Sequence, residues 1–205
     1  MTFDLLLALT GFAFVTSASP GPGNLLLLTS GVNFGFRRSL PLVLGISLGF
    51  LAMVFLVGIG LGPLLQRFPL LALALKVACI AYVLWLAWKI ANATSRVGAD
   101  GDTAARPIGF VQAALLQWLN PKAWTVALIL TVSYTTPGSS TADYVTSLLL
   151  VIFCFAMVNL PSISLWALSG VALRWMFEDP VRLRRFNLAM ALLLVLSMAP
   201  VMLKI

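Results

Sequence analysis

The sequence predicts an all-α integral membrane protein with six transmembrane helices, arranged as a 3+3 inverted repeat in which helices 1 and 4 are broken. Composition is the first observation, because 61% of the 205 residues are hydrophobic and 9% are charged, whereas soluble domains are about 45–50% apolar. Length is the second: at about 20 apolar residues per span, the chain has room for six helices and little else. The third is a pair of polar, helix-breaking motifs at matching positions in the two halves of the chain.

Six apolar segments follow one another along the chain, with turns or polar loops between them. They lie near residues 3–32, 40–65, 69–91, 108–134, 144–172 and 186–203. The runs are too long and too little alternating for strands of a membrane barrel, so helices remain. The first segment has no basic residue before its apolar run, and Ala18-Ser19-Pro20 is a poor cleavage site. We therefore expect a mature span there and not a signal peptide.

The first segment is interrupted by the motif Ser19-Pro20-Gly21-Pro22-Gly23-Asn24. Prolines lack an N–H donor and glycines allow unusual dihedrals, so the helix can stop there and restart near Asn24. A restarting helix presents free N–H groups and a partial positive charge, which favour an anion such as a carboxylate. The motif therefore predicts a substrate-binding site made by Pro20, Gly21, Pro22, Gly23 and Asn24. A simple helix kink is the alternative interpretation.

The fourth segment is interrupted by Asn120-Pro121-Lys122. Lys122 lies about 14 residues into the segment, or roughly 20 Å at the helical rise of 1.5 Å, and hence near the bilayer centre. A cation there costs about 2.5–3.5 kcal/mol on insertion scales, so it should meet an anion or oriented carbonyl groups. A substrate carboxylate would suit it, whereas the alternative is that Lys122 binds the carbonyls freed by Pro121. Lys76, in the third segment, is a second candidate that could instead reach the membrane surface.

Further polar residues in the second half could line the same cavity. Gln117 and Asn120 belong to the fourth segment, and Asn159, Pro161 and Ser162 are expected to interrupt the fifth. Their alternative role is hydrogen bonding between helices. The pairs Gly31/Gly35 and Gly45/Gly49 fit the small-residue spacing that allows helices to pack closely.

The polar stretch from Asn92 to Pro107 divides the single transporter domain. We expect repeat one at about residues 1–92, a cytoplasmic loop at about 93–107, and repeat two at about 108–205. An odd number of spans in each half inverts the second half relative to the first. Most basic residues fall in the loops between segments one and two, three and four, and five and six, and basic loops tend to be cytoplasmic. Both termini lie on the opposite side of the membrane and are therefore predicted to be periplasmic. The basic residues of those loops are Arg37, Arg38, Lys89, Arg96, Arg106, Arg174, Arg182, Arg184 and Arg185.

Several chemistries have no residues to support them. The chain has no histidine, which excludes His-dependent hydrolysis and imidazole metal sites. Its six acidic residues lie near span ends or in loops, so no metal or other cofactor is predicted. The net charge of +7 reports membrane orientation and does not indicate a nucleic-acid partner. An enzyme is not expected, although a thiol-disulfide redox enzyme using Cys79 and Cys154, a channel and an accessory membrane subunit remain alternatives.

Five short motifs carry a resemblance to a known family. They are Ser19 to Asn24, Gly35-Phe36-Arg37, Gly45-Ile46-Ser47-Leu48-Gly49, Lys76 before Tyr82-Val83-Leu84-Trp85-Leu86, and Gln117-Trp118-Leu119-Asn120-Pro121-Lys122-Ala123. At these residues the chain resembles the LysE/RhtB-type amino-acid exporters, the lysine exporter and homoserine/threonine translocator family. Residues 45–50 and 82–90 look most like exporters of cysteine and O-acetylserine.

The resemblance implies six helices and export of amino acids or close derivatives across the bacterial inner membrane. It further implies secondary active transport by proton antiport with alternating access, with a homodimer as one arrangement. It places Pro20, Pro22, Asn24, Lys76, Asn120, Pro121 and Lys122 among the site residues. The chain departs from the family pattern in having Gly23 between Pro22 and Asn24 and no histidine in the second segment.

Overall fold

The computed structural model describes residues 2–61, 69–92, 107–135 and 140–197, and every regular element in these ranges is helical. The predicted all-α class is therefore confirmed. The elements are α1 (Phe3–Ala18), α2 (Pro22–Phe34), α3 (Phe36–Leu56) with a π-helical end (Val57–Leu61), α5 (Pro69–Ala91), α6 (Phe110–Trp118), α7 (Pro121–Ser133), α8 (Thr141–Leu173) with a 3-10 end (Arg174–Phe177), and α9 (Pro180–Ser197).

Two described helices are long and apolar enough to cross a membrane, Phe36–Gly60 and Thr141–Phe177. The bent pair Phe3–Ala18 and Pro22–Phe34 makes a third if its halves count as one span. Helices α6 and α7 contain 9 and 13 residues, each too short for a span of about 20 residues. The six-helix repeat consequently stays a prediction.

Both predicted breaks are present. Helices α1 and α2 meet at an angle of 56°, and α2 restarts with Pro22 at its first turn after the extended residue Gly21. In the second half, α6 ends at Trp118 and α7 restarts with Pro121. Proline suits the first position of a helix because its missing N–H would have no intrahelical partner there. Helices α2 and α7, which follow the two breaks, thus both begin with a proline.

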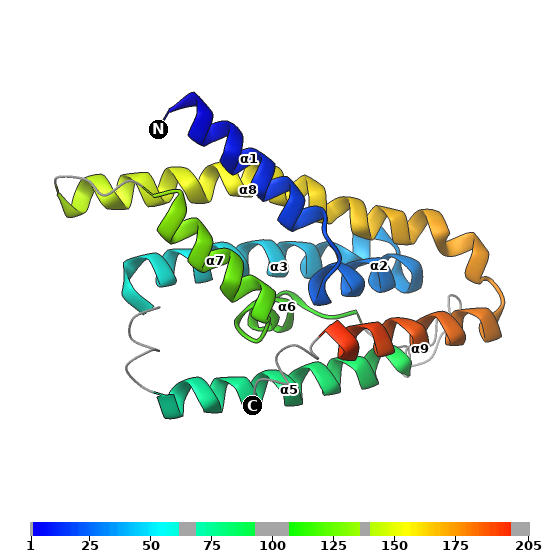
Figure 1. Cartoon of the computed structure of the whole chain (residues 1–205). Coiled ribbons are helices and arrows are strands. Elements are labelled where there is room, and N and C mark those ends of the chain that lie inside the picture. The colour runs from blue at the N-terminus through cyan, green and yellow to red at the C-terminus, as the bar shows by residue number, and fades with distance from the viewer. Residues whose placement is uncertain (1, 62–68, 93–106, 136–139, 198–205) are drawn as a thin grey trace.

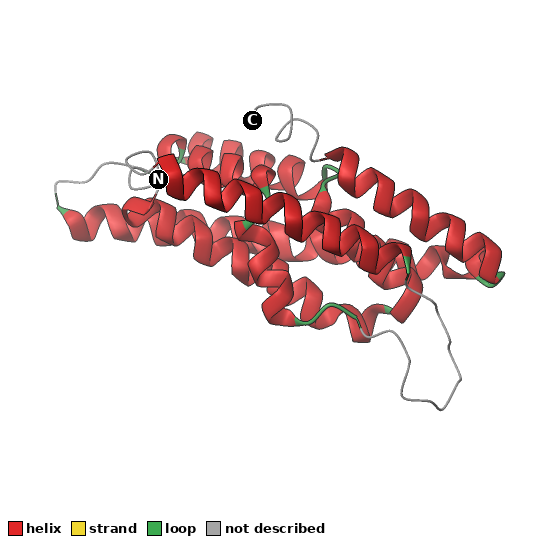
Figure 2. Cartoon of the chain, turned by 90° about the horizontal axis from the view of Figure 1, so that it is seen from below, coloured by secondary structure: helices red, strands yellow, loops and turns green. Residues whose placement is uncertain are grey.

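In Figure 1, α8 runs across the upper part of the molecule with α3 below it, and α5 lies beside α9 along the lower edge. Figure 2 shows the same helical arrangement turned by 90°. Helix α3 packs along α6 and α8, and α2 packs along α8, so segments from the two halves interleave. Helix α1 crosses α8 on the face opposite α5 and α9 (Figure 1).

Two buried apolar clusters fill the interior. The first joins α2, α6, α5 and α9 with the adjoining parts of α3 and α8, and includes Ile46 and Ile163. The second joins α1 and α7 with the remaining parts of α3 and α8, and includes Phe50 and Phe155. Helices α3 and α8 each contribute residues to both clusters, and each passes from one cluster to the other at the level where α1 and α6 end. The interior therefore has two layers that meet at the level of the breaks.

Glycines bring helices together on the α2 and α6 side of the breaks. A Cβ atom on Gly49 would lie 2.6 Å from Cα of Ala114 on α6, and Gly45 is equally crowded against Phe110 and Ala113. A Cβ atom on Gly31 would lie 3.1 Å from Cα of Gly170 on α8 and closer still to a carbonyl group. The packing predicted for Gly31, Gly45 and Gly49 is confirmed.

Two local predictions are wrong. Gly35 makes no helix contact of this kind; its φ of 78° forms the junction between α2 and α3, a conformation that favours glycine. Residues 159–162 do not interrupt the fifth segment, because α8 runs through Pro161 without a break. A proline removes only one N–H group, and a helix that is held by neighbouring helices continues past it.

Candidate functional site

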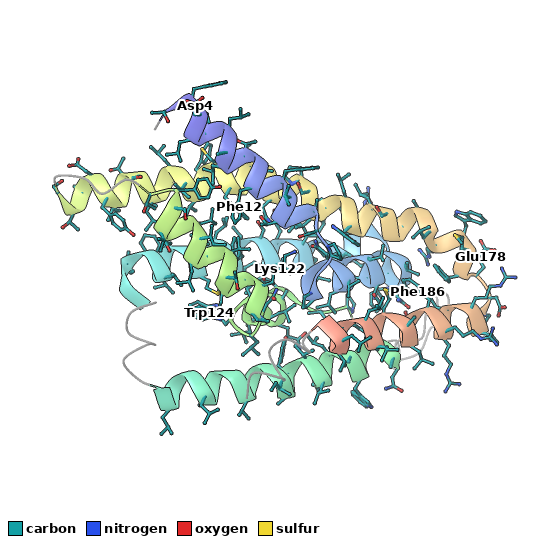
Figure 3. All side chains as sticks on the ribbon, in the orientation of Figure 1. Asp4, Phe12, Lys122, Trp124, Glu178 and Phe186 are labelled. Carbon is teal, nitrogen blue, oxygen red and sulfur yellow. The ribbon has the colours of Figure 1, made fainter. Side chains whose placement is uncertain are left out.

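Lys122 connects the two breaks. Its Nζ donates to the carbonyl oxygen of Ser19 at 2.9 Å and to Oγ of Ser19 at 2.8 Å. The partners are thus the carbonyl and hydroxyl freed where α1 ends, and not carbonyls freed by Pro121. Figure 3 shows Lys122 in the middle of the molecule, whereas Asp4 and Glu178 lie at its ends. The cation is held where both halves of the chain leave helical geometry.

Asn24 ties the end of α1 to the start of α2. Its Nδ2 donates to the carbonyl oxygens of Ser17 at 2.7 Å and Ser19 at 2.9 Å. The first backbone bond of α2 runs from the N–H of Leu25 to the carbonyl of Gly21 at 3.0 Å. The N–H groups of Gly23 and Asn24 come before it and have no preceding helical turn to accept them. The start of α2 therefore offers donors, as the sequence predicts.

Asn120 and Gly21 shape the space around the lysine. Asn120 caps α7, because its Oδ1 accepts from the backbone N–H of Lys122 at 3.1 Å. A Cβ atom on Gly21 would lie 3.1 Å from Cδ and 3.4 Å from Nζ of Lys122. A side chain at Gly21 would therefore press on the lysine and shift it by a few tenths of an ångström.

Gln117 carries a donor without a partner. The residue is only 4% exposed, and its Nε2 is the one buried side-chain nitrogen or oxygen among the described residues that has no hydrogen-bond partner. The same nitrogen lies 3.9 Å from the position that a Cβ atom on Gly23 would take. A buried amide left unpaired costs about 1–3 kcal/mol. It points to a ligand that completes the hydrogen bonding when the site is occupied.

Asn159 links three helices beside the breaks. Its Oδ1 accepts from Oγ of Ser47 on α3 at 3.1 Å, and its Nδ2 donates to Oγ of Ser17 on α1 at 2.9 Å. Asn159 is 7% exposed and Ser47 is 2% exposed. The side chain that sequence reasoning placed at an interruption thus points sideways from an unbroken α8 into the interior.

These groups surround a cavity of about 60 Å³, enough for a few waters or a molecule of similar size. Its wall on the α1 and α7 side carries Phe50 and Phe155, whose ring centroids lie 5.1 Å apart. The lining residues are Thr16, Ser17, Gly21, Gly23, Asn24, Ile46, Phe50, Gln117, Asn120, Lys122, Ala123, Val126, Phe155, Asn159 and Ile163. The lining therefore combines polar groups with apolar side chains.

Seven of the predicted site residues line this cavity, and three described ones do not. The seven are Gly21, Gly23, Asn24, Gln117, Asn120, Lys122 and Asn159. Pro22 and Pro121 start helices beside it, and Pro20 is exposed. Lys76 belongs to α5, but its side chain, like that of Cys79, lies outside the described part of the structure.

The sequence reasoning missed Thr16, Ser17, Phe50 and Phe155 in the lining, and Ser19 as the partner of Lys122. Ser17 and Ser19 stand next to the first break, which is a signal that could have identified them. The two phenylalanines are ordinary apolar residues of long helices, so no local pattern identifies them. Trp124 does not line the cavity; its Nε1 donates to the carbonyl of Trp118 at 2.8 Å.

The described residues contain no group of three His, Cys, Asp or Glu side chains placed to hold a metal ion. Cys154 is a partly buried free cysteine of α8. The arrangement brings one cation, several amide groups and a helix start to one small cavity, which suits recognition of a small polar molecule.

Comparison with known proteins identifies relatives over nearly the whole chain. The family described as LysE type translocator matches residues 14–202. The cysteine/O-acetylserine efflux protein of Escherichia coli (strain K12) is 34% identical over 196 residues, which cover 95% of this chain and 96% of the relative. The proteins of the same name from Escherichia coli O9:H4 (strain HS) and Shigella sonnei (strain Ss046) show the same identity and coverage. No solved structure matches the chain.

Proposed function

Because this chain belongs to the LysE type translocator family, we propose that it is a secondary active exporter of small amino acids or close derivatives across the bacterial inner membrane. Its apolar helices and its relatives, which are efflux proteins, point to a membrane transporter and not to an enzyme. The observation that carries the proposal is the cavity in which Lys122, Gln117 and the start of α2 meet.

In the proposed complex, the substrate carboxylate lies between the free N–H groups of Gly23 and Asn24, Nε2 of Gln117 and Nζ of Lys122. A helix N-terminus and a lysine both favour an anion, and charge-assisted hydrogen bonds are the stronger ones. The substrate side chain then lies against Phe50 and Phe155 on the apolar wall. This placement satisfies the buried donor of Gln117, which has no protein partner.

We propose six spans in two inverted repeats of one domain, about residues 1–92 and 108–205, joined by the cytoplasmic loop near 93–107. In this scheme α1 with α2 matches α6 with α7, α3 matches α8, and α5 matches α9. The matching breaks and the paired proline starts of α2 and α7 support it. The distribution of basic residues then places both termini in the periplasm, and puts α2 and α6 on the cytoplasmic side.

A difference in packing between the two sides supports alternating access. Glycine contacts hold α2 against α8 and α6 against α3 on the proposed cytoplasmic side. The cavity lies at the level of the breaks, and its lining extends past them to Thr16 of α1 and Val126 of α7. The proposed cycle therefore starts from a state closed toward the cytoplasm, and the repeats rock around the site to open that side.

Proton antiport supplies the driving force in this proposal, and Lys122 is the candidate carrier because it is the one ionisable residue among the described residues of the lining. A conservative Lys122→Arg variant that keeps full pH-coupled export would contradict that role. The cycle needs only one chain, so the homodimer stays a prediction that crosslinking in the membrane tests.

Amino-acid efflux from proteoliposomes loaded with a labelled mixture tests the proposal. The wild-type protein should release one or a few amino acids when a proton gradient is imposed. Lys122→Ala should reduce this release by about 10- to 150-fold, since a hydrogen bond to a charged group contributes roughly 1.5–3 kcal/mol. Lys89→Ala is the matched control, because Lys89 lies over the ring of Trp85, away from the cavity. Efflux without counterflow would indicate a channel, and no selective efflux from folded protein would refute the proposal.

A further inference from the structure

The described residues place a positive charge at the cavity but no negative charge. Within the part of the chain that the structure describes, Lys122 is the one ionisable side chain of the lining. The described acidic residues, Asp4, Asp143, Glu178 and Asp179, are all exposed and lie outside the lining. An amino acid bound here would find a cation for its carboxylate but no described carboxylate for its ammonium group.

The hydrogen-bond donors and acceptors around the cavity also favour an anion. Donors point to the cavity from Gln117, Lys122 and the start of α2. The oxygens nearby already accept bonds from the protein: Oδ1 of Asn159 accepts from Ser47, the carbonyl of Ser17 accepts from Asn24, and the carbonyl of Ser19 accepts from Asn24 and Lys122. Nε2 of Gln117 is thus a buried donor without a partner, and the ammonium group of Lys122 has a third N–H beyond its two bonds to Ser19, whereas each of these oxygens already accepts at least one bond.

From this imbalance we infer that the site recognises its ligand through the carboxylate and does not require an ammonium group. The protein then also exports small carboxylates that have no amino group, with 3-mercaptopropionate as the simplest example. The inference rests on the proposed export function, and it names a substrate class beyond amino acids.

We expect the site to discriminate only weakly between an amino acid and the same molecule without its ammonium group. A site that is built to pair a substrate N–H group rejects an analogue without it by about 10⁴- to 10⁵-fold, because its own buried partner is left unpaired. Here no described carboxylate would be left unpaired when the ammonium group is absent. We therefore expect 3-mercaptopropionate to bind within about tenfold of cysteine, a difference of about 1.4 kcal/mol.

Three compounds that share a thiol test the inference. Cysteine has both charged groups, 3-mercaptopropionate keeps the carboxylate, and cysteamine keeps the ammonium group. Their binding to the detergent-purified protein is measured by calorimetry, and their exchange is measured as inhibition of counterflow in proteoliposomes. The expected order is cysteine close to 3-mercaptopropionate, with cysteamine far weaker than both.

Substitutions at Gln117 sharpen the test. Gln117→Glu keeps the size of the side chain and replaces its donor with a carboxylate, so 3-mercaptopropionate should bind at least about tenfold more weakly while cysteamine gains. Gln112→Glu is the matched control. It makes the same change on the same helix, where the side chain accepts from the N–H of Gly109 at 3.3 Å outside the cavity. Should Gln117→Glu not fold, Gln117→Leu should weaken cysteine and 3-mercaptopropionate by the same factor.

The outcomes separate the inference from the proposed function. Amino-acid export with weak or absent binding of 3-mercaptopropionate, or with cysteamine the better ligand, would overturn the inference and leave the exporter intact. Binding of 3-mercaptopropionate with no amino-acid export would overturn the proposed function and leave a carboxylate site. Absence of both would overturn both.

Discussion

Replacing Gly49 with alanine should force α3 and α6 apart. The added Cβ atom would lie 2.6 Å from Cα, 2.9 Å from Cβ and 2.9 Å from the carbonyl oxygen of Ala114. These are backbone atoms or a methyl group, so no flexible side chain can move aside. Ordinary contacts at this kind of site begin at 3.4 Å, so the helices must separate by somewhat less than about 1 Å. Overpacking of this kind costs about 1–3 kcal/mol.

The effect of Gly49→Ala should be measured on both the free energy of unfolding and the rate of export. Unfolding of the detergent-purified protein in increasing SDS gives the free-energy change, and Gly11→Ala is the control because a Cβ atom there meets nothing within 4 Å. We expect the control to be as stable as the wild type or more stable by up to about 1 kcal/mol, because alanine favours a helix more than glycine does. Ala114 lies one turn before Gln117 on α6, so Gly49→Ala should also slow export. Adding Ala114→Gly should restore only part of the stability, since Cα and the carbonyl remain. Equal stability of Gly49→Ala and Gly11→Ala would refute the close-packing argument.

Three further predictions concern stability and orientation. Asn33→Leu should lower the free energy of unfolding by about 1–3 kcal/mol, because Nδ2 of Asn33 donates to Asn187 at 3.0 Å and Nδ2 of Asn187 donates to Asn33 at 3.3 Å. A double variant with Asn187→Leu should recover part of that loss, and additive losses would contradict the pairing. Tyr82→Phe removes a 2.7 Å bond to a backbone carbonyl of α6 and should cost about 1 kcal/mol in the same unfolding assay; an unchanged stability would count against that bond. In a background without the native cysteines, Thr2→Cys should react with an impermeant maleimide added to intact cells, and Arg184→Cys should react only after permeabilisation; the reverse pattern would invert the proposed topology.

The sequence predicted the helical class and both breaks because these depend on local chemistry. Proline has no N–H to donate and glycine tolerates unusual dihedrals, so the motifs at residues 19–24 and 120–122 stop a helix wherever they occur. The same reasoning failed at Pro161, where α8 continues. A single proline is a weaker signal than two prolines and two glycines together, and neighbouring helices decided the outcome.

The site was predicted in part, and the missing residues share a reason. Gly21, Gly23, Asn24, Gln117, Asn120, Lys122 and Asn159 were identified because polar or helix-breaking residues are conspicuous in apolar segments. Phe50 and Phe155 have nothing to distinguish them from the other apolar residues of α3 and α8. Their role in the wall depends on which helix faces lie against the cavity, which is a property of packing.

By itself, the sequence determined that this chain is an apolar helical protein with two broken segments and one lysine deep in the fourth. Only the tertiary structure decided that Lys122 binds Ser19, which is 103 residues away, and that Nε2 of Gln117 faces Gly23 without a partner of its own. Helix breaks are set by the backbone chemistry of a few adjacent residues. The meeting of the two breaks depends on which helices far apart in the chain pack together, and the spacing of small residues indicates close packing without naming the partner helix.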